Sequence, residues 1–326
     1  MPRIPKVRAS QQTIVFGLFL LLFTGFALFL PGFAKADNLL TMVQNVAILG
    51  ILGMGMAVVV IGRGIDISMI ASLAVPSGLL LQTMQGGHDL ATAAALSLGL
   101  SLAFGLFNGW LIAYAEVPSL FATLASGLFL AGLGQAFIFQ LEVVQWPQSL
   151  DAIAWFGRGG IAGVPMPVVM FALASAVMAV LLRRVRAGAA IYAMGDNPMS
   201  ARATGLPTRP LMVFEYVLAS LIGLFAGVVM AASVSSMPTR VYNSTMVYDV
   251  VLVVVLGGIG LTGGRGGVSN VIIGTLLIGT MLNGMTILDM SYSVQNIIKG
   301  TVLLVAILID SVLNPRNEET AQQGDI

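Results

Sequence analysis

The sequence contains no cysteine, a single histidine (His88) and only three lysines among its 326 residues. The lack of cysteine excludes disulfide bonds, thiolate metal sites and cysteine nucleophiles. Histidine and carboxylates do not gather at metal-ligand spacing, and neither H-E-x-x-H nor G-x-S-x-G occurs. We therefore expect no metal, no cofactor and no catalytic site, and hence a protein that is not an enzyme.

Nucleotide and nucleic-acid binding also lack a basis in this sequence. The glycine-rich stretch GGIGLTGGRGG (257–267) lacks the lysine and hydroxyl of the phosphate-binding G-x-x-x-x-G-K-[ST] motif. Any energy from ATP must then come from a partner subunit. The formal net charge is +1, and the basic residues are spread among loops rather than gathered on one face, so we expect no nucleic acid partner.

Long apolar runs dominate what is present. Hydrophobic residues make up 57% of the chain and charged residues only 9%, against about 25% in an ordinary soluble domain. Runs near the ~20 residues that cross a bilayer recur throughout. We predict an all-α polytopic membrane protein with a single transmembrane domain (14–313) between a cytoplasmic N-terminal segment (1–13) and a cytoplasmic tail (314–326). The ten expected spans are 14–33, 41–61, 67–85, 90–114, 118–140, 166–186, 209–234, 248–263, 268–288 and 295–313.

The basic residues give the orientation of these spans, because cytoplasmic loops of membrane proteins carry an excess of Lys and Arg. Placing both termini in the cytoplasm puts eleven basic residues inside and three outside. The inner set is Arg3, Lys6, Arg8, Arg63, Arg183, Arg184, Arg186, Arg202, Arg209, Arg265 and Arg316, and the outer set is Lys35, Arg158 and Arg240.

The first apolar run has two interpretations. Ala34-Lys35-Ala36 has the form of a signal-peptide cleavage site. However, the run 14–33 exceeds the roughly 7–15 apolar residues of a signal peptide. We expect an uncleaved first span, with cleavage as the alternative.

Few polar residues fall inside the expected spans or at their edges. Asp66 lies in GRGIDIS, where it either caps the third span or lines a solute path together with Arg63. Asn108 and Asn283 either line that path or form interhelical hydrogen bonds. Glu215 and Asp249 lie near span ends, which argues against an ion-driven carrier without excluding one.

The stretch MGDNPMSARATGL (194–206) is polar and lies between two long apolar runs. Asp196 or Asn197 can cap a helix, and Pro198 suits its first turn. Gly205 suits its end. This pattern predicts a short helix along the cytoplasmic membrane surface. Its Arg and small residues, Ala201 among them, suit docking into a groove of a cytoplasmic partner.

Taken together, these motifs resemble the transmembrane permease subunits of bacterial ATP-binding-cassette (ABC) importers of the ribose/monosaccharide type, which also include autoinducer-2 permeases. The resemblance covers roughly residues 39–310. It is carried, in the order of the family, by GIDIS (64–68), VPSLFATLASG (117–127), GDNPMSARATGL (195–206), LGGIGLTGGRGG (256–267), Asn283-Gly284 and Lys299-Gly300.

The resemblance implies a permease in the bacterial inner membrane that works by alternating access as a pair of copies or related chains. Its partners would be a cytoplasmic ABC ATPase and a periplasmic sugar-binding protein, and its substrate a pentose, hexose or related polyol. The stretch 195–206 would be the coupling helix seated on the ATPase. The implied coupling residues are Gly195, Asp196, Asn197, Ala201, Arg202 and Gly205, and the solute path is expected near Asp66, Ser68, Asn108 and Asn283.

Three positions depart from the family pattern. The family usually has two adjacent glycines before the Ile-Asp pair, where this chain has Arg63-Gly64. Val247 replaces a common acidic residue, and Asn270 replaces a glycine. These departures leave the choice of substrate open. The alternative function is an ion-gradient-driven secondary transporter of a small polar solute.

Overall fold

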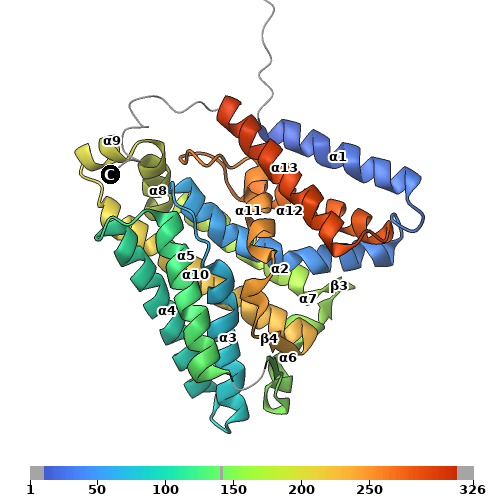
Figure 1. Cartoon of the computed structure of the whole chain (residues 1–326), viewed down its shortest axis with the longest axis horizontal. Helices are drawn as coiled ribbons and strands as arrows, with labels where there is room; N and C mark the ends of the chain where they lie inside the picture. Colours follow the sequence, from blue (N-terminus) through green and yellow to red (C-terminus); the bar gives the residue numbers. More distant parts are fainter. Residues whose placement is uncertain (1–10, 140–141, 314–326) are drawn as a thin grey trace, which may run out of the picture.

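The computed structural model describes residues 11–139 and 142–313. These residues are almost entirely helical, with two small two-stranded pieces of sheet (Figure 1). Residues 1–10, 140–141 and 314–326 lie outside the described part, and with them most of the predicted N-terminal segment and the whole predicted tail. The helices are α1 (Gln11–Phe29), α2 (Ala36–Ile61), α3 (Met69–Gln85), α4 (Leu90–Ala113), α5 (Ser119–Leu133), α6 (Asp151–Arg158), α7 (Met166–Arg184), α8 (Arg186–Asp196), α9 (Pro198–Ala203), α10 (Thr208–Val234), α11 (Met246–Leu256), α12 (Val268–Ile287) and α13 (Tyr292–Leu313).

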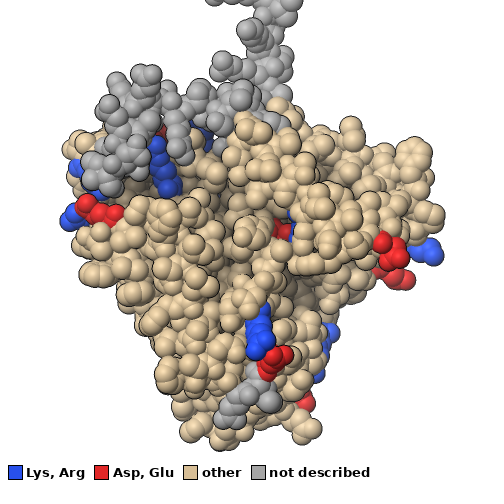
Figure 2. Space-filling model, viewed as in Figure 1, with Lys and Arg blue, Asp and Glu red and all other residues tan. Residues whose placement is uncertain are grey.

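The length and composition of these helices identify a polytopic membrane protein. In the described part, seven helices are long and apolar enough to cross a bilayer, namely α1, α2, α4, α5 extended by a π-helical turn (Gly134–Ile138), α7, α10 and α12. The helices α3, α11 and α13 are apolar but shorter in the ranges described. In Figure 2, charged atoms lie at the upper left, at the right edge and in the lower part of the face, and the area between them is uncharged apart from a small recessed spot of acidic and basic atoms.

Each of the ten expected spans coincides with a helix, and the number of membrane crossings stays a prediction. The expected and observed bounds differ most for the eighth span. It was expected at 248–263, but α11 already ends at Leu256. The glycines that follow adopt turns instead of helix, and Gly258, Gly263 and Gly264 have positive φ angles. A left-handed backbone cannot continue a right-handed helix.

Helix α2 lies at the centre of the molecule, and 89% of its most apolar 18-residue stretch is buried. Helix α1 is peripheral, with 6% of the corresponding stretch buried. Helix α10 packs against α2, α3 and α4. Its close approach to α4 depends on Gly105 and Gly109, where an added β-carbon would lie 2.6 Å from the α-carbons of Val217 and Val213, respectively. Small residues at this four-residue spacing let membrane helices pack backbone to backbone.

The connections gather at two opposite ends of the helical body. Helix α6 and strand β4 (Ser236–Pro238) lie at the lower end in Figure 1, and α8 and α9 lie at the upper left. Strand β1 (Val143–Gln145) pairs antiparallel with β4, while β2 (Gly160–Ile161) pairs with β3 (Val164–Pro165). Two 3₁₀ turns complete the connections, Gln148–Leu150 and Val241–Asn243.

Candidate functional site

The predicted short helix is present as α9, and its ends follow from local chemistry. The Asn197 side chain accepts the backbone N–H of Ser200 at 3.0 Å and so is the N-cap, and Pro198 occupies the first turn. Gly205 follows the C-cap with φ +82° and donates its N–H to the Arg202 carbonyl, while the Leu206 N–H bonds the Ala201 carbonyl. This pair of bonds is the Schellman arrangement, which favours glycine at that point.

The segment before α9 is itself a helix, α8, and it ends against the rest of the chain. An added β-carbon at Gly195 would lie 1.8 Å from the carbonyl oxygen of Ile61 and 2.7 Å from the amide nitrogen of Gly264. That Gly264 N–H donates to the Ile61 carbonyl at 2.8 Å. Three segments distant in sequence therefore meet backbone to backbone.

We call this meeting point the glycine junction; it comprises residues 61–64, 195–196 and 263–266. Its third segment is held from α8 as well, because the Tyr192 hydroxyl donates to the Gly266 carbonyl at 2.7 Å. A β-carbon at Gly264 would lie 2.7 Å from the Asp196 backbone, so a side chain there would force the segments apart. The junction fixes α8 and α9 relative to the loops that follow α2 and α11.

The loop after α2 leads from the glycine junction into a buried polar cluster. Asp66, Ser68 and Asn108 are 1%, 1% and 2% exposed, and we call them the Asp66 cluster. The Asp66 carboxylate accepts both the N–H and the hydroxyl of Ser68. The Ser68 hydroxyl accepts the Asn108 side-chain amide at 2.9 Å. The chain of bonds joins the α2–α3 loop to α4.

Helix α5 supports the same loop from the other side. The hydroxyls of Ser119 and Thr123 accept the backbone N–H groups of Ile65 and Ile67 at 3.2 and 3.1 Å. Gly127 is close enough to Ser68 that an added β-carbon would be 3.0 Å from its α-carbon. The VPSLFATLASG motif thus positions the residues of the Asp66 cluster.

The two interpretations of Asp66 can now be compared with its contacts. The residue preceding α3 is Ser68, and Asp66 binds the Ser68 amide in the turn before the helix, so it stabilises the helix entry without occupying the N-cap. Arg63 makes no ion pair with Asp66 in the described part of the chain. Burial raises the pKa of the Asp66 carboxyl to about 6, and the bonds from Ser68 oppose that shift.

The predicted path residues are not all brought together. Asn283 on α12 exchanges two side-chain hydrogen bonds with Asn38 of α2, at 2.9 and 3.0 Å. These bonds match the interhelical alternative for Asn283 and leave it outside the Asp66 cluster. Next to it, Gly284 packs against the ring of Phe26 from α1.

The predicted coupling residues divide into exposed and buried groups. Asp196, Asn197, Arg202 and Gly205 are exposed or partly exposed. Gly195 and Ala201 are buried within this chain. Ala201 packs with Met194 and Leu211 of its own chain, and the docking role of all six residues stays a prediction.

Sequence reasoning missed the contacts of two neighbouring residues of α10. Glu215 is 1% exposed, and both of its carboxylate oxygens lie against Gly62. Its Oε1 has no hydrogen-bond partner among the residues that the structure describes. The hydroxyl of Tyr216 packs in the same way against Gly64. The only sequence signal was a carboxylate two turns into an apolar run. The glycines that Glu215 and Tyr216 contact are about 150 residues away in the chain.

Asn270, one of the departures from the family pattern, also has a structural role that the sequence did not reveal. Its side-chain amide donates to the carbonyl of Gly257 at 2.7 Å, at the point where α11 ends. The bond satisfies one of the carbonyls left free at a helix C-terminus. In the described ranges, no three His, Asp or Glu side chains lie close enough together to hold a metal ion.

The described part is almost entirely helical, and seven of its helices are long and apolar enough to cross a bilayer. A family profile described as "Branched-chain amino acid transport system / permease component" matches residues 38–307, and the chain belongs to this family of permeases. The chain is 33% identical over 294 residues to the ribose import permease protein RbsC of Bacillus subtilis, covering 86% of each chain.

Other relatives extend the comparison. RbsC of Escherichia coli K12 is 31% identical over 283 residues, covering 86% of this chain and 88% of its own. The xylose transport system permease protein XylH of Haemophilus influenzae is 26% identical over 339 residues, covering 86% and 90%. No solved structure matches the chain.

Proposed function

We propose that this chain is the transmembrane permease subunit of an ATP-driven importer that carries a monosaccharide or related polyol across the bacterial inner membrane. The permease family and the sugar-transporting relatives support this function. Its partners are a cytoplasmic ABC ATPase, a periplasmic sugar-binding protein and a second permease chain, either a copy or a paralogue.

The proposed topology has ten spans and both termini in the cytoplasm. In Figure 1, the start of α1 and the end of α13 lie toward the same end of the molecule as α8 and α9. The opposite end carries α6 and the paired strands β1 and β4, which would then face the periplasm. The excess of arginine in the connections near α8 and α9 supports the same orientation.

The observation that carries the proposal is the glycine junction. The end of α8, which leads directly into α9, and the end of α2 are joined through direct backbone contacts at Gly195, Ile61 and Gly264. That loop continues within a few residues to the Asp66 cluster. A displacement of α9 by the ATPase would therefore move the polar residues inside the bundle, because packed backbones leave little space to absorb it.

Helix α9 presents a suitable surface for the ATPase. Met199 is 56% exposed and Arg202 is also exposed, while Ala201 on the opposite side anchors the helix to its own chain. Methionine is an adaptable apolar contact, and arginine donates hydrogen bonds in a fixed direction. In this proposal Gly195 and Ala201 transmit the movement, and the exposed residues receive it.

The proposed translocation path passes the Asp66 cluster. Asp66, Ser68 and Asn108 form connected donors and acceptors inside an apolar body, as a polyhydroxylated solute requires. Asn108 Oδ1 is buried and has no hydrogen-bond partner among the described residues, so it is available to a passing hydroxyl. Asn283 lies elsewhere and is not included.

Affinity purification of the permease from native membranes tests the coupling role. A P-loop ATPase should co-purify with the wild type and be lost with Arg202→Glu. The matched control is Arg240→Glu, because Arg240 is also exposed but pairs with Glu142 beside the β1–β4 ladder, away from α9.

The control variant should retain the ATPase at wild-type level. Absence of an ATPase from the wild type in every detergent, with transport that collapses when the proton gradient is dissipated, would contradict the proposal and favour the secondary transporter.

A further inference from the structure

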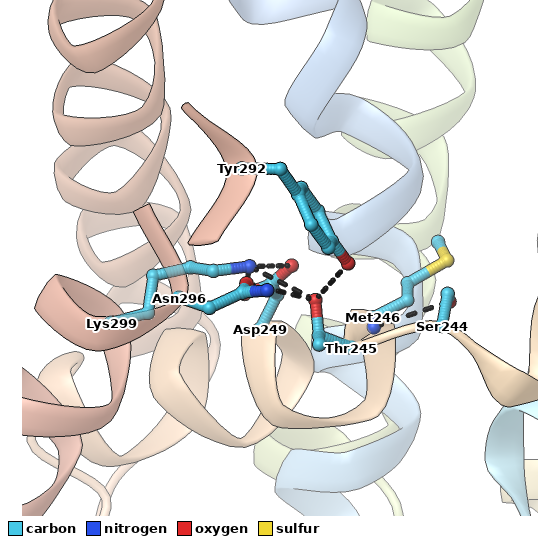
Figure 3. A network of polar contacts seen from close by, with 7 residues as sticks. All are labelled: Ser244, Thr245, Met246, Asp249, Tyr292, Asn296 and Lys299. Atoms are coloured by element: carbon cyan, nitrogen blue, oxygen red, sulfur yellow. Dashed lines mark hydrogen bonds and ion pairs between the residues drawn. The ribbon is translucent and has the colours of Figure 1, made fainter. Parts of the chain in front are cut away.

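A second polar cluster lies where α11 and α13 meet, far from the Asp66 cluster in sequence. It comprises Thr245, Asp249, Tyr292, Asn296 and Lys299, and we call it the α11–α13 cluster (Figure 3). Residues 292, 296 and 299 follow the four- and three-residue steps that share one face of a helix, and residues 245 and 249 do the same. The two faces therefore bring five polar side chains together.

An ion pair forms the deep part of this cluster. Lys299 Nζ lies 2.8 Å from Asp249 Oδ1 and donates to Asp249 Oδ2 at 3.1 Å, with residue exposures of only 6% and 9%. The same ammonium group donates to the Thr245 hydroxyl at 3.1 Å. The positive and negative charges balance, so the cluster is electrically neutral as a whole.

The outer part of the cluster is open. The Tyr292 hydroxyl lies 2.9 Å from the Thr245 hydroxyl, and Tyr292 is 61% exposed. Thr245 is the residue before α11, where threonine usually caps the helix, yet its side chain makes no capping bond and faces Lys299 and Tyr292 instead. The Thr245 hydroxyl therefore bonds side chains of the cluster and does not cap the helix.

Apolar packing does not explain why Lys299 is buried. Among the residues of α13 whose side chains are described (292–308), Lys299 alone is buried, and its neighbours in sequence are half-buried or exposed. A buried ion pair costs desolvation that an apolar pair of similar volume avoids, so a structural attachment of α13 would be made more simply by leucine or methionine. Figure 2 shows acidic and basic atoms meeting in a recess between the positions of α11 and α13 in Figure 1.

From this geometry we infer that the α11–α13 cluster is a binding site for a neutral polyhydroxylated solute. Carboxylate and hydroxyl oxygens accept the hydroxyl protons of a sugar, the ammonium group donates to its oxygens, and the exposed ring of Tyr292 offers an apolar face. The inference rests on the proposed function and extends it. In the proposed orientation, the cluster lies at the outer ends of α11 and α13, where solute enters.

Cysteine protection tests the site, because the chain has no cysteine of its own. Ser244→Cys puts a thiol at the edge of the cluster and leaves the five residues intact (Figure 3). Tyr248→Cys is the matched control, since Tyr248 is 56% exposed on the same helix and its side chain is not one of the five that form the cluster. Each variant, reconstituted in nanodiscs, is labelled with a hydrophilic maleimide. Labelling is measured without additive, in the presence of ribose, xylose or galactose, and in the presence of betaine at equal concentration.

At least one monosaccharide should slow labelling of the Ser244→Cys variant by threefold or more, with no effect on the Tyr248→Cys variant. Betaine should protect neither variant. Adding Asp249→Asn and Lys299→Met to Ser244→Cys should abolish protection, and the melting temperature of this triple variant shows whether it is folded. A folded triple variant that keeps full protection would overturn the inference.

ATP-dependent uptake of the same sugars, measured with the assembled transporter, separates this inference from the proposed function. Uptake of a sugar that gives no protection of the Ser244→Cys variant overturns the binding site and leaves the proposed function standing. Protection by a sugar that is not taken up in an ATP-dependent way supports the site and contradicts the proposed function.

Discussion

The α-carbon of Gly195 lies so close to the last turn of α2 that an added methyl group would be 1.8 Å from the carbonyl oxygen of Ile61. The obstacle is backbone, which cannot move aside as a side chain can. Any residue larger than glycine must therefore separate α8 from α2 and weaken the glycine junction.

Gly195→Ala should lower the free energy of unfolding by about 1–3 kcal/mol, as overpacking of a close contact does. It should also reduce ATP-dependent uptake while the ATPase still binds, because the exposed face of α9 is unchanged. Thermal unfolding in detergent and uptake by reconstituted vesicles measure the two effects.

The control for this variant is Gly99→Ala in α4. Apart from the adjoining backbone of α4, no atom of the described residues lies within 4 Å of a β-carbon at Gly99. Alanine is favoured over glycine inside a helix by roughly 0.5–1 kcal/mol. The same substitution should therefore stabilise the protein here. A similar loss in both variants would mean that the glycine junction plays no special part.

Arg63→Gly should stabilise the protein. Arg63 has φ +79°, a left-handed conformation that costs a residue with a side chain about 1–2 kcal/mol. Part of that gain is lost to the greater freedom of glycine in the unfolded chain, so we expect a net increase of about 1 kcal/mol in the free energy of unfolding. The same conformation accounts for the glycine that the resemblance implied at this position.

Arg202→Gly is the matched control, because Arg202 lies inside α9. Glycine in a helix interior costs roughly 1 kcal/mol relative to good helix formers. The melting temperature should therefore fall for Arg202→Gly and rise for Arg63→Gly. A fall for both would show that Arg63 makes contacts worth more than its backbone strain.

Gly62 and Glu215 should be energetically coupled. A β-carbon at Gly62 would lie 2.2 Å from both carboxylate oxygens of Glu215, so Gly62→Ala alone displaces a buried side chain. Glu215→Ala removes that obstacle, and the double variant should be more stable than the sum of the single effects by about 0.5–3 kcal/mol. Additive melting data in this double-mutant cycle would contradict the contact.

Asp66→Asn should remove a pH dependence of stability. The folded pKa of about 6 lies above the ordinary value of 3.8, so the folded protein favours the protonated carboxyl. The stability contributed by this group is fully present below about pH 4 and is lost as the pH rises through about 6.

Asparagine keeps an oxygen for the Ser68 bonds and cannot titrate. The melting temperature of the wild type relative to Asp66→Asn should therefore fall between about pH 4 and about pH 7. Parallel curves over this interval would show that Asp66 is not perturbed by burial.

The sequence predicted the helices that apolar composition determines and missed those that it does not. Long apolar runs located α2, α10 and α12 within a few residues, because a bilayer requires that length. Helices α6 and α8 have only 8 and 11 residues and are mixed in composition, so a periodic pattern of that length is too short to establish a helix from the sequence. The end of α11 was misplaced because apolar residues continue between glycines that turn the backbone.

The candidate site was predictable only where its chemistry is local. Asn197 and Gly205 were identified from the rules of helix ends, which involve neighbours in sequence. The burial of Ala201 depends on Leu211, and the buried pair Asp249–Lys299 joins residues 50 positions apart. Such contacts follow from the packing of whole helices and leave no pattern in a single segment.

Helix α9 is capped at both ends and anchored through Ala201 within the single chain. An ATPase that binds it has no disordered segment to organise, so the conformational entropy usually lost on association is already lost when the permease folds. In the proposed complex, the permease then offers a preformed surface, and changes in affinity should appear mainly in the rate of dissociation.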